Sequence, residues 1–141
     1  MITLVENSIT VDEYLYLRNQ VGWVRLSDRQ AEMALENCLY CVKAVDEAGY
    51  ILGMGRIVGD GAVISYIQDL VVIPEAQGKG VGSMLINSLV DYVKSITEEH
   101  TTMMLCLMCA KGRESFYEKH NFVARPTDNL GPGMIQYIKS I

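Results

Sequence analysis

The spacing of apolar residues predicts one strand and two helices in the first part of the chain. Residues 1–5 are predicted to form a strand, and positions from Val11 to Val21 recur at helical spacing, which predicts a helix near 11–21. Ser27, followed three residues later by Gln30, is a capping-box pattern that begins a second helix. The buried stripe of this second helix is expected at Ala31, Ala34, Leu35 and Cys38.

The middle of the chain changes to runs that are rich in β-branched and aromatic residues. Residues 39–45, 50–58 and 62–73 are strand-like and are separated by short turns, which predicts three consecutive antiparallel strands. Asp60-Gly61 suits a type I′ hairpin turn, which needs positive φ at both central residues.

Helical spacing returns at Val81 and continues to Ile96, with apolar residues at Leu85, Leu89 and Val93. Residues 102–108 follow as a short buried strand, and residues 113–120 as a short helix that ends at Asn121, a residue type that tolerates the left-handed conformation of a C-cap. Two closing strands are predicted at 122–124 and 134–138. This order predicts an α+β fold, a mixed and mainly antiparallel sheet flanked by helices, in a single domain over residues 1–141.

Composition and charge argue against several classes of protein, namely nucleic-acid-binding, secreted and membrane-spanning proteins. Half of the 141 residues are hydrophobic and the net charge is −5, with no basic run, which argues against a nucleic-acid-binding surface. The first ten residues lack the basic region of a signal peptide. No apolar stretch approaches the roughly 18 to 20 residues of a membrane span. We therefore expect a cytoplasmic protein that binds neither nucleic acid nor membrane.

The four cysteines form two CxxC pairs, Cys38 with Cys41 and Cys106 with Cys109. Such pairs occur in zinc sites and in redox centres. Both pairs lie in strand-like apolar sequence, however, and residues i and i+3 of a strand point to opposite faces. We expect free, buried or half-buried structural thiols, suited to a reducing compartment, and no metal site.

Three glycines in the stretch VVIPEAQGKGVGSML suggest a backbone that something approaches closely. A Walker A loop is excluded, because Lys79 is followed by Gly80 and not by a hydroxyl residue. A dinucleotide fingerprint is excluded by the GxGxG spacing and by the antiparallel strands that precede it. A strand, a short turn and a helix N-terminus remain.

Successive backbone N–H groups at such a helix N-terminus suit a diphosphate that is held without a metal. The residues that would supply them are Gln77, Gly78, Lys79, Gly80, Val81, Gly82 and Ser83. The alternative is a glycine-rich turn that packs tightly against its own chain.

The stretch LVVIPEAQGKGVG resembles the acyl-CoA-binding motif of the GNAT superfamily of N-acetyltransferases, Q/R-x-x-G-x-G/A after a strand of the pattern L-x-V-x-P. Gln77, Gly80 and Gly82 fill the three signature positions. The segment FYEKHNF is similar to a second motif of the family at the expected distance downstream, and the order of elements also resembles the family's.

The resemblance implies an acetyl-CoA-dependent N-acetyltransferase that acts on a primary amine of a small molecule or peptide, with no metal. Leu70, Val71 and Val72 would line the pantetheine arm, as an added strand does in β-augmentation. The residues from Gln77 to Ser83 would hold the pyrophosphate. The rival reading is a non-catalytic domain that binds acyl-CoA as a regulatory or interaction module.

Tyr117 occupies the family's usual general-acid position, where a phenol can protonate the departing sulfur. Asp69 is the candidate base, acting directly or through water. Strand alternation places it on the face opposite Leu70, which equally suits a structural hydrogen bond.

Family members bind the acceptor with the first two helices and the hairpin loops, so Trp23 and Arg25 are the candidate substrate-binding residues. Trp23 would support an apolar substrate body, and Arg25 would bind a carboxylate or phosphate. A homodimer is expected by analogy alone. Four positions depart from the family's pattern, at Tyr66, Ala110, Arg113 and Asn121.

Overall fold

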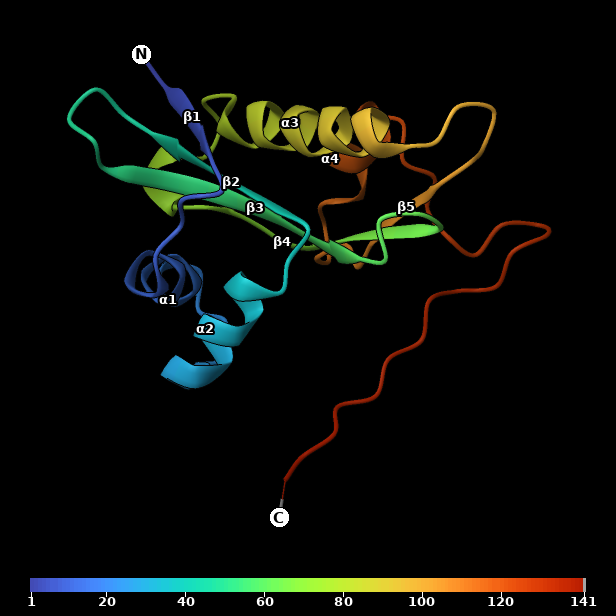
Figure 1. The fold of residues 1–141 in the computed structure, drawn as a ribbon, viewed down its shortest axis with the longest axis horizontal. Helices are drawn as coiled ribbons and strands as arrows, with labels where there is room; N and C mark the ends of the chain where they lie inside the picture. The colour runs from blue at the N-terminus through green and yellow to red at the C-terminus, as the bar shows by residue number, and fades with distance from the viewer. Residues whose placement is uncertain (141) are drawn as a thin grey trace. The chain divides into compact units, whose positions relative to one another are not determined.

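The computed structural model describes residues 1–140, and the chain divides into two compact units, Met1–Leu107 and a second that begins at Met108 (Figure 1). The first unit holds every strand of the described chain. Its elements are β1 (Thr3–Glu6), α1 (Val11–Gln20), α2 (Asp28–Glu36), β2 (Tyr40–Val45), β3 (Ile51–Gly59), β4 (Ile64–Val72), η1 (Pro74–Ala76), α3 (Val81–Ile96) and β5 (Met104–Leu107). The second unit contains α4 (Glu114–Lys119).

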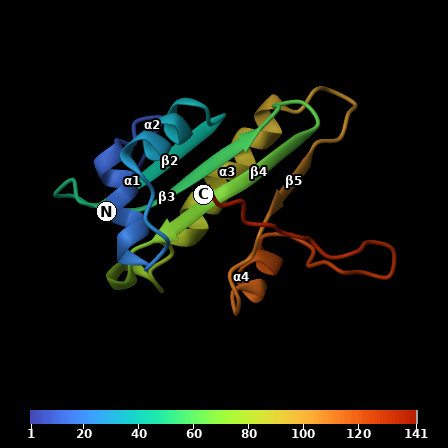
Figure 2. The ribbon, with the colours of Figure 1, turned by 90° about the horizontal axis from the view of Figure 1, so that it is seen from below.

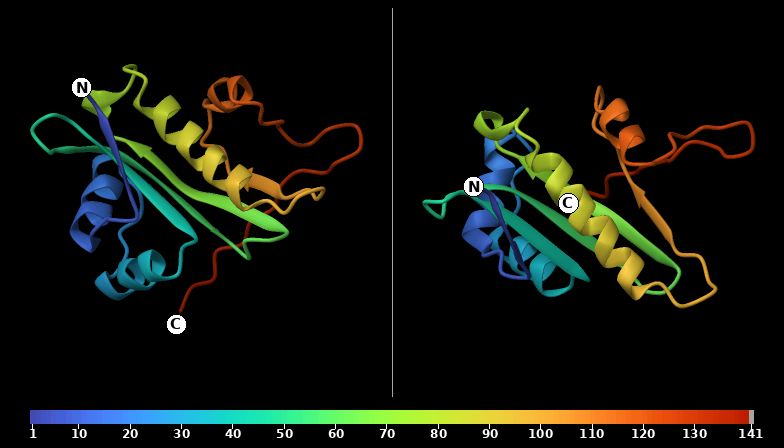
Figure 3. Two further views of the ribbon diagram at one scale, coloured as in Figure 1. Left: turned by 45° about the horizontal axis from the view of Figure 1, so that its top comes forward. Right: turned by 90° about the horizontal axis from the view of Figure 1, so that it is seen from above.

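The sheet has the strand order β1-β2-β3-β4-β5, in which the first four strands are antiparallel and β5 is parallel to β4. Helix α3 lies across one face, and α1 and α2 lie on the other (Figure 3). This is the α+β fold that the order of elements predicts, and the prediction is confirmed.

Two glycines of β3 let α3 pack closely on the sheet. A Cβ atom added at Gly55 would lie 2.7 Å from Cδ1 of Leu89, and one at Gly53 would lie 2.5 Å from the carbonyl oxygen of Val71. Gly53 and Gly55 face α3. Because side chains alternate along a strand, Met54 and Arg56 face the opposite side, toward α1 and α2. The register carries this alternation to β4, because Arg56 is paired with Asp69.

The helix starts are fixed by side chains. The predicted capping box of Ser27 and Gln30 is present, with hydrogen bonds of 2.9 and 3.0 Å. The same motif begins α1 at Thr10 and Glu13, where it was not predicted. Helix α2 ends at Glu36, so Cys38 lies outside it, and of the four predicted stripe residues Ala31 alone is buried.

The prediction of a type I′ turn at Asp60-Gly61 is wrong. Gly61 has a φ of 73°, but Asp60 is not among the residues with positive φ. The Asp60 carboxylate instead accepts backbone N–H groups of Ala62, Val63 and Ile64 at 2.8 to 3.0 Å. These hydrogen bonds lower the pKa of Asp60 and close a longer loop than a two-residue turn.

The two predicted closing strands are also wrong. Residues 122–124 and 134–138 have no strand structure, and the side chains of Val123, Met134 and Ile138 are exposed. Their composition favours strands, but a strand forms only against a partner, and none pairs with them within residues 1–140. The predicted end of α4 is confirmed, since Asn121 has a φ of 70° just beyond the helix.

Gly53→Ala is expected to reduce the free energy of unfolding by about 1–3 kcal/mol, because the added methyl group meets a backbone oxygen that cannot move without shifting β4. Gly131→Ala is the matched control, since nothing lies within 4 Å of its added Cβ. Urea denaturation followed by circular dichroism measures both. Equal stability of the two variants would contradict the close packing of β3 against β4.

Candidate active site

Strand β4 has a backbone edge that is open over its second half. Strand β5 pairs with Ile64–Ile67 only, through the register Ile64↔Met104 to Ile67↔Leu107. On its other side β4 stays paired with β3 as far as Val72. Within residues 1–107 no strand lies against the outer edge of Gln68–Val72 (Figure 2).

The amide groups of Leu70 and Val72 face this open edge. Ile73 donates its N–H to the carbonyl oxygen of Leu52 at 2.9 Å, so Ile73 and Val71 direct their backbone groups toward β3. Alternation then directs those of Leu70 and Val72 outward, and the Val72 carbonyl oxygen accepts from Nε2 of Gln77 at 3.0 Å. The edge therefore offers hydrogen bonds to an extended ligand. The side chain of Val71 is buried on the α1 face, so Val71 contributes chiefly by spacing the other two.

The loop between β4 and α3 exposes backbone N–H groups. Gly78 and Gly80 have φ values of 77° and 84°, and Gly80 is the N-cap of α3 without a side chain to cap it. The first bond within the helix joins the Met84 N–H to the Gly80 carbonyl oxygen. The amides of Val81 and Gly82 therefore point out of the helix N-terminus, where the helix dipole favours an anion.

The space around the two left-handed glycines of this loop is open. Nothing lies within 4 Å of a Cβ atom added at Gly78 or Gly80. The glycines are needed for their left-handed backbone and leave the surface above them open. Gly78 and Gly80 are therefore not packed tightly against the rest of the chain. Lys79 is exposed beside them and adds a positive charge.

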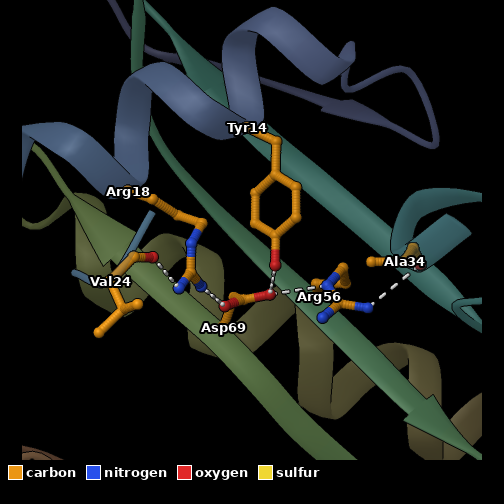
Figure 4. Close-up of polar contacts among 6 residues, drawn as sticks. All are labelled: Tyr14, Arg18, Val24, Ala34, Arg56 and Asp69. Carbon is orange, nitrogen blue, oxygen red and sulfur yellow. Dashed lines mark hydrogen bonds and ion pairs between the residues drawn. The ribbon is translucent and has the colours of Figure 1, made fainter. Parts of the chain in front are cut away.

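Asp69, the candidate base, lies at the centre of a buried polar cluster (Figure 4). Its Oδ2 accepts from the Tyr14 hydroxyl at 2.7 Å and from Nε of Arg56 at 2.6 Å. Its Oδ1 accepts from Arg18 at 3.4 Å. The Asp69 side chain is 0% exposed, and those of Arg56 and Arg18 are 7% and 13% exposed.

The charges in the cluster are stabilised by one another. Burial raises the pKa of Tyr14 to about 12, and the Asp69 charge adds to the effect, so its hydroxyl remains a donor. Burial acts to lower the pKa of Arg56, but the Asp69 carboxylate outweighs it and raises that pKa. Both oxygens of Asp69 are bonded, and its side chain is closed to solvent. These contacts favour a structural role for Asp69 over that of a base.

The candidate acceptor residues lie in the loop after α1. Trp23 is 38% exposed, and its ring lies 5.2 Å from the Arg18 guanidinium. Arg25 is exposed. The structure thus brings Trp23 next to the cluster of Asp69.

Tyr117, the candidate acid, lies in the second unit on α4. It packs edge-on against Phe116 and Phe122, with ring centroids 5.1 and 5.9 Å away. Burial raises the pKa of the Tyr117 hydroxyl, and the nearby Cys109 adds to the effect. The hydroxyl therefore stays protonated at neutral pH, which is the state a general acid requires.

The first cysteine pair differs from its prediction. Cys38 precedes β2 and is not part of a strand, and its thiol donates to the carbonyl oxygen of Leu35 at 3.3 Å. Interaction with the Cys41 thiol raises the pKa of Cys38. All four cysteines are free, but Cys109 is exposed, contrary to expectation. Within residues 1–140 no group of three or more potential ligands could hold a metal ion. None of the described helices has the length and apolar character to cross a bilayer.

A groove of the first unit lies elsewhere, between β1 and α3. This groove of about 690 Å³ is lined by Glu6, Tyr40, Ser88 and Tyr92 among others, and by no residue of the loop or the open edge. The two tyrosine rings stack with centroids 4.4 Å apart, and the Tyr40 hydroxyl bonds Glu6 at 2.9 Å. We give more weight to the open edge and the loop, because a cofactor that adds to a strand needs backbone groups and not an enclosed cavity.

Known proteins share this fold. The family model of the acetyltransferase (GNAT) family matches residues 8–122. A solved structure from methicillin-resistant Staphylococcus aureus, described as a protein of unknown function and probable acetyltransferase, is 29% identical, with a TM-score of 0.85 over 99% of this chain and 100% of that one. A GNAT family acetyltransferase from Streptococcus pneumoniae is 27% identical, with a TM-score of 0.82 over the same shares.

A relative in the red alga Pyropia yezoensis, an uncharacterized N-acetyltransferase ycf52, is 26% identical over 122 residues, which are 84% of this chain and 68% of that protein. A five-stranded, mostly antiparallel sheet with helices on both faces is the fold that these acetyltransferase structures share with this chain. The chain belongs to the GNAT family of acetyltransferases. Acetyl transfer is the class of reaction that these comparisons support.

Sequence reasoning did not identify Tyr14, Arg18 and Arg56 as parts of the site. A signal was present, because Arg18 falls on the otherwise apolar stripe of α1 and Arg56 within an apolar strand. A charged residue at a buried position requires a partner, and Asp69 is the acid on the neighbouring strand. The sequence could therefore have predicted that Arg18 and Arg56 are buried and paired, but it could not have predicted that both bind the same carboxylate.

Tyr14→Phe is expected to cost about 1–3 kcal/mol of unfolding free energy below pH 10, because Asp69 loses a buried donor. The pKa of Tyr14 is raised from 10 to about 12, so the folded chain keeps a proton that the unfolded chain loses. The stabilisation is therefore complete below pH 10 and is lost as the pH rises toward 12. Denaturation from pH 8 to 12 should show the two proteins converging, and a constant difference would contradict the assignment.

Proposed function

We propose that this protein is an acetyl-CoA-dependent N-acetyltransferase that acetylates a primary amine of a small molecule or a peptide. The observation that carries the proposal is the combination of an open β4 edge with an anion cradle one short turn further along the chain. Pantetheine would bond to Leu70 and Val72 along that edge. The pyrophosphate would bind the amides of residues 78–83, with Lys79 at the rim, because the Gln77 N–H already donates to the Pro74 carbonyl oxygen at 3.2 Å. Each part of the donor then meets groups suited to it.

The reaction requires polarisation of the thioester carbonyl. An outward N–H of β4 at Leu70 or Val72 would donate to the carbonyl oxygen as negative charge develops there. The amine nitrogen forms a bond to the carbonyl carbon, and the carbon–sulfur bond breaks. Tyr117 would give its proton to the departing sulfur, a role supported by its place in the FYEKHNF segment.

The amine must also lose a proton. Asp69 is not assigned this step, because Tyr14, Arg56 and Arg18 occupy both of its oxygens. We assign the proton to solvent water. The four free cysteines suit the reducing cytoplasm, and we place the reaction there.

The test is release of free thiol from acetyl-CoA in the presence of a panel of amines, namely amino acids, polyamines and peptides with a free N-terminus. At least one amine should accelerate thiol release in proportion to enzyme concentration, with a matching acetylated product by mass spectrometry. If calorimetry shows that acetyl-CoA binds while no amine yields product, the chain is a binding module and the enzymatic proposal fails.

Tyr117→Phe is expected to lower kcat about 10²-fold or more, because the leaving thiolate loses its proton donor while the ring still packs. The KM for acetyl-CoA should stay close to that of the wild type. Tyr50→Phe is the control, since Tyr50 is a tyrosine 72% exposed in the turn between β2 and β3. Undiminished turnover in Tyr117→Phe would remove Tyr117 as the acid.

A further inference from the structure

Arg18 fixes the loop that follows α1 by three contacts. Its carbonyl oxygen accepts the N–H of Trp23 at 3.0 Å, and its Nη2 donates to the carbonyl oxygen of Val24 at 2.9 Å. Its guanidinium also lies 5.2 Å from the centre of the Trp23 ring, within the range of a cation–π interaction. The guanidinium makes two of these contacts, so the placement of the Trp23 ring and of the Val24 carbonyl group depends on where it is held.

Asp69 holds that guanidinium. Arg18 and Arg56 reach the same carboxylate from α1 and from β3, and both arginines are almost fully buried (Figure 4). Two guanidinium cations this close repel each other strongly away from water, so they converge only because the Asp69 charge lies between them. Without the Asp69 charge, repulsion from Arg56 favours an Arg18 side chain that points toward solvent. The contacts of its guanidinium with the Val24 carbonyl oxygen and the Trp23 ring are then lost.

The surface of this loop is suited to binding a small substrate. Trp23 is partly exposed, Val24 is 82% exposed, and Arg25 adds an exposed cation. An aromatic ring held rigidly by its neighbours binds with little loss of conformational freedom. Asp69 also directly precedes Leu70, whose outward amide belongs to the proposed thioester-binding edge. One carboxylate thus joins the loop to the strand that would hold the acetyl donor.

We propose that Asp69 is a positioning residue, which acts through Arg18 to fix the Trp23–Arg25 loop as the surface that binds the acceptor amine. The inference rests on the proposed function, because the acceptor is that of the acetyl transfer. It differs from a base role in a measurable way. A base is needed for turnover at any amine concentration, whereas a residue that orders the acceptor surface is needed chiefly for amine binding.

The first test needs no activity, because Trp23 is the only tryptophan of the chain. Asp69→Asn and Arg18→Gln should both shift the Trp23 emission to longer wavelength and increase its quenching by acrylamide, since both release the loop. Asp91→Asn, an exposed aspartate on α3, is the matched control and should leave both signals unchanged. Wild-type emission in Asp69→Asn would overturn the proposal.

The second test compares kinetic constants. Asp69→Asn and Arg18→Gln should each raise the KM for the amine about ten- to a hundredfold, while the KM for acetyl-CoA changes less than about twofold. The pH profile of kcat should keep its shape. The double variant should be no worse than the poorer single variant, because both changes break one chain of contacts.

The opposite pattern would overturn the proposal in favour of a base. In that case Asp69→Asn would abolish kcat and remove the acidic limb of its pH profile, while Arg18→Gln stayed near wild type. Circular dichroism melts check that each variant folds. Should Asp69→Asn not fold, Arg18→Lys replaces it, because a single ammonium cannot reach Asp69 and the Val24 carbonyl oxygen together. Wild-type emission and amine KM in Arg18→Lys would also contradict the proposal.

The two tests separate this inference from the proposed function. If the wild type acetylates no amine, the proposed function fails, yet the Trp23 emission still shows whether Asp69 holds the loop. If the wild type is active but its Trp23 emission and amine KM do not respond to Asp69, the positioning role fails and the acetyltransferase proposal stands.

Discussion

The buried carboxylate of Asp69 is the interaction on which the arrangement of the first unit depends. It is bonded to Tyr14 on α1 and to Arg56 on β3, and is paired more loosely with Arg18. Removing three charged side chains from water is costly, and their mutual attraction offsets that cost only in a well-formed geometry. The cluster therefore specifies how α1 lies on the sheet, and Arg56 extends the constraint to α2 through its bond to the Ala34 carbonyl oxygen at 3.2 Å.

The proposed donor site follows from the same strand. β4 is paired with β3 from Ser65 to Val72, with a shift in register at Gln68, and its buried face is held by the Asp69 cluster, but β5 accompanies only its first four residues. The remaining edge keeps its shape without a strand neighbour, which preorganises it for a ligand that adds as a strand would. The glycine-rich turn then delivers the N-terminus of α3 directly after this edge. Recognition by backbone amides explains why glycine and strand geometry define this site more than side chains do.

The local features of the fold could be predicted from the sequence. The Ser27 capping box, the apolar stripe of α3 and the glycines before it depend on residues close together in the chain, and the structure contains all three. The loop's motif also pointed to the GNAT family, to which the chain belongs. In each case the relevant contacts span only a few residues.

The features that could not be predicted depend on distant partners or on local dihedral angles. Tyr14 and Asp69 are 55 residues apart, and no local pattern announces that three donors meet on one carboxylate. The prediction of two closing strands failed because residues that favour strands form one only where a neighbouring strand is available to pair with them. Cys38 and Cys41 were placed on opposite faces because the chain was taken to be extended, whereas it bends between α2 and β2. A two-residue turn was predicted at Asp60, but the Asp60 carboxylate accepts three backbone N–H groups and so forms a longer loop.

The most direct test of the central claim is a crystal structure of the protein with coenzyme A bound. The account predicts pantetheine hydrogen-bonded to the outward amides of Leu70 and Val72, and the pyrophosphate on the backbone N–H groups between Gln77 and Ser83. Coenzyme A bound elsewhere, such as in the groove between β1 and α3, with the β4 edge and the loop amides making no contact to it, would contradict the account.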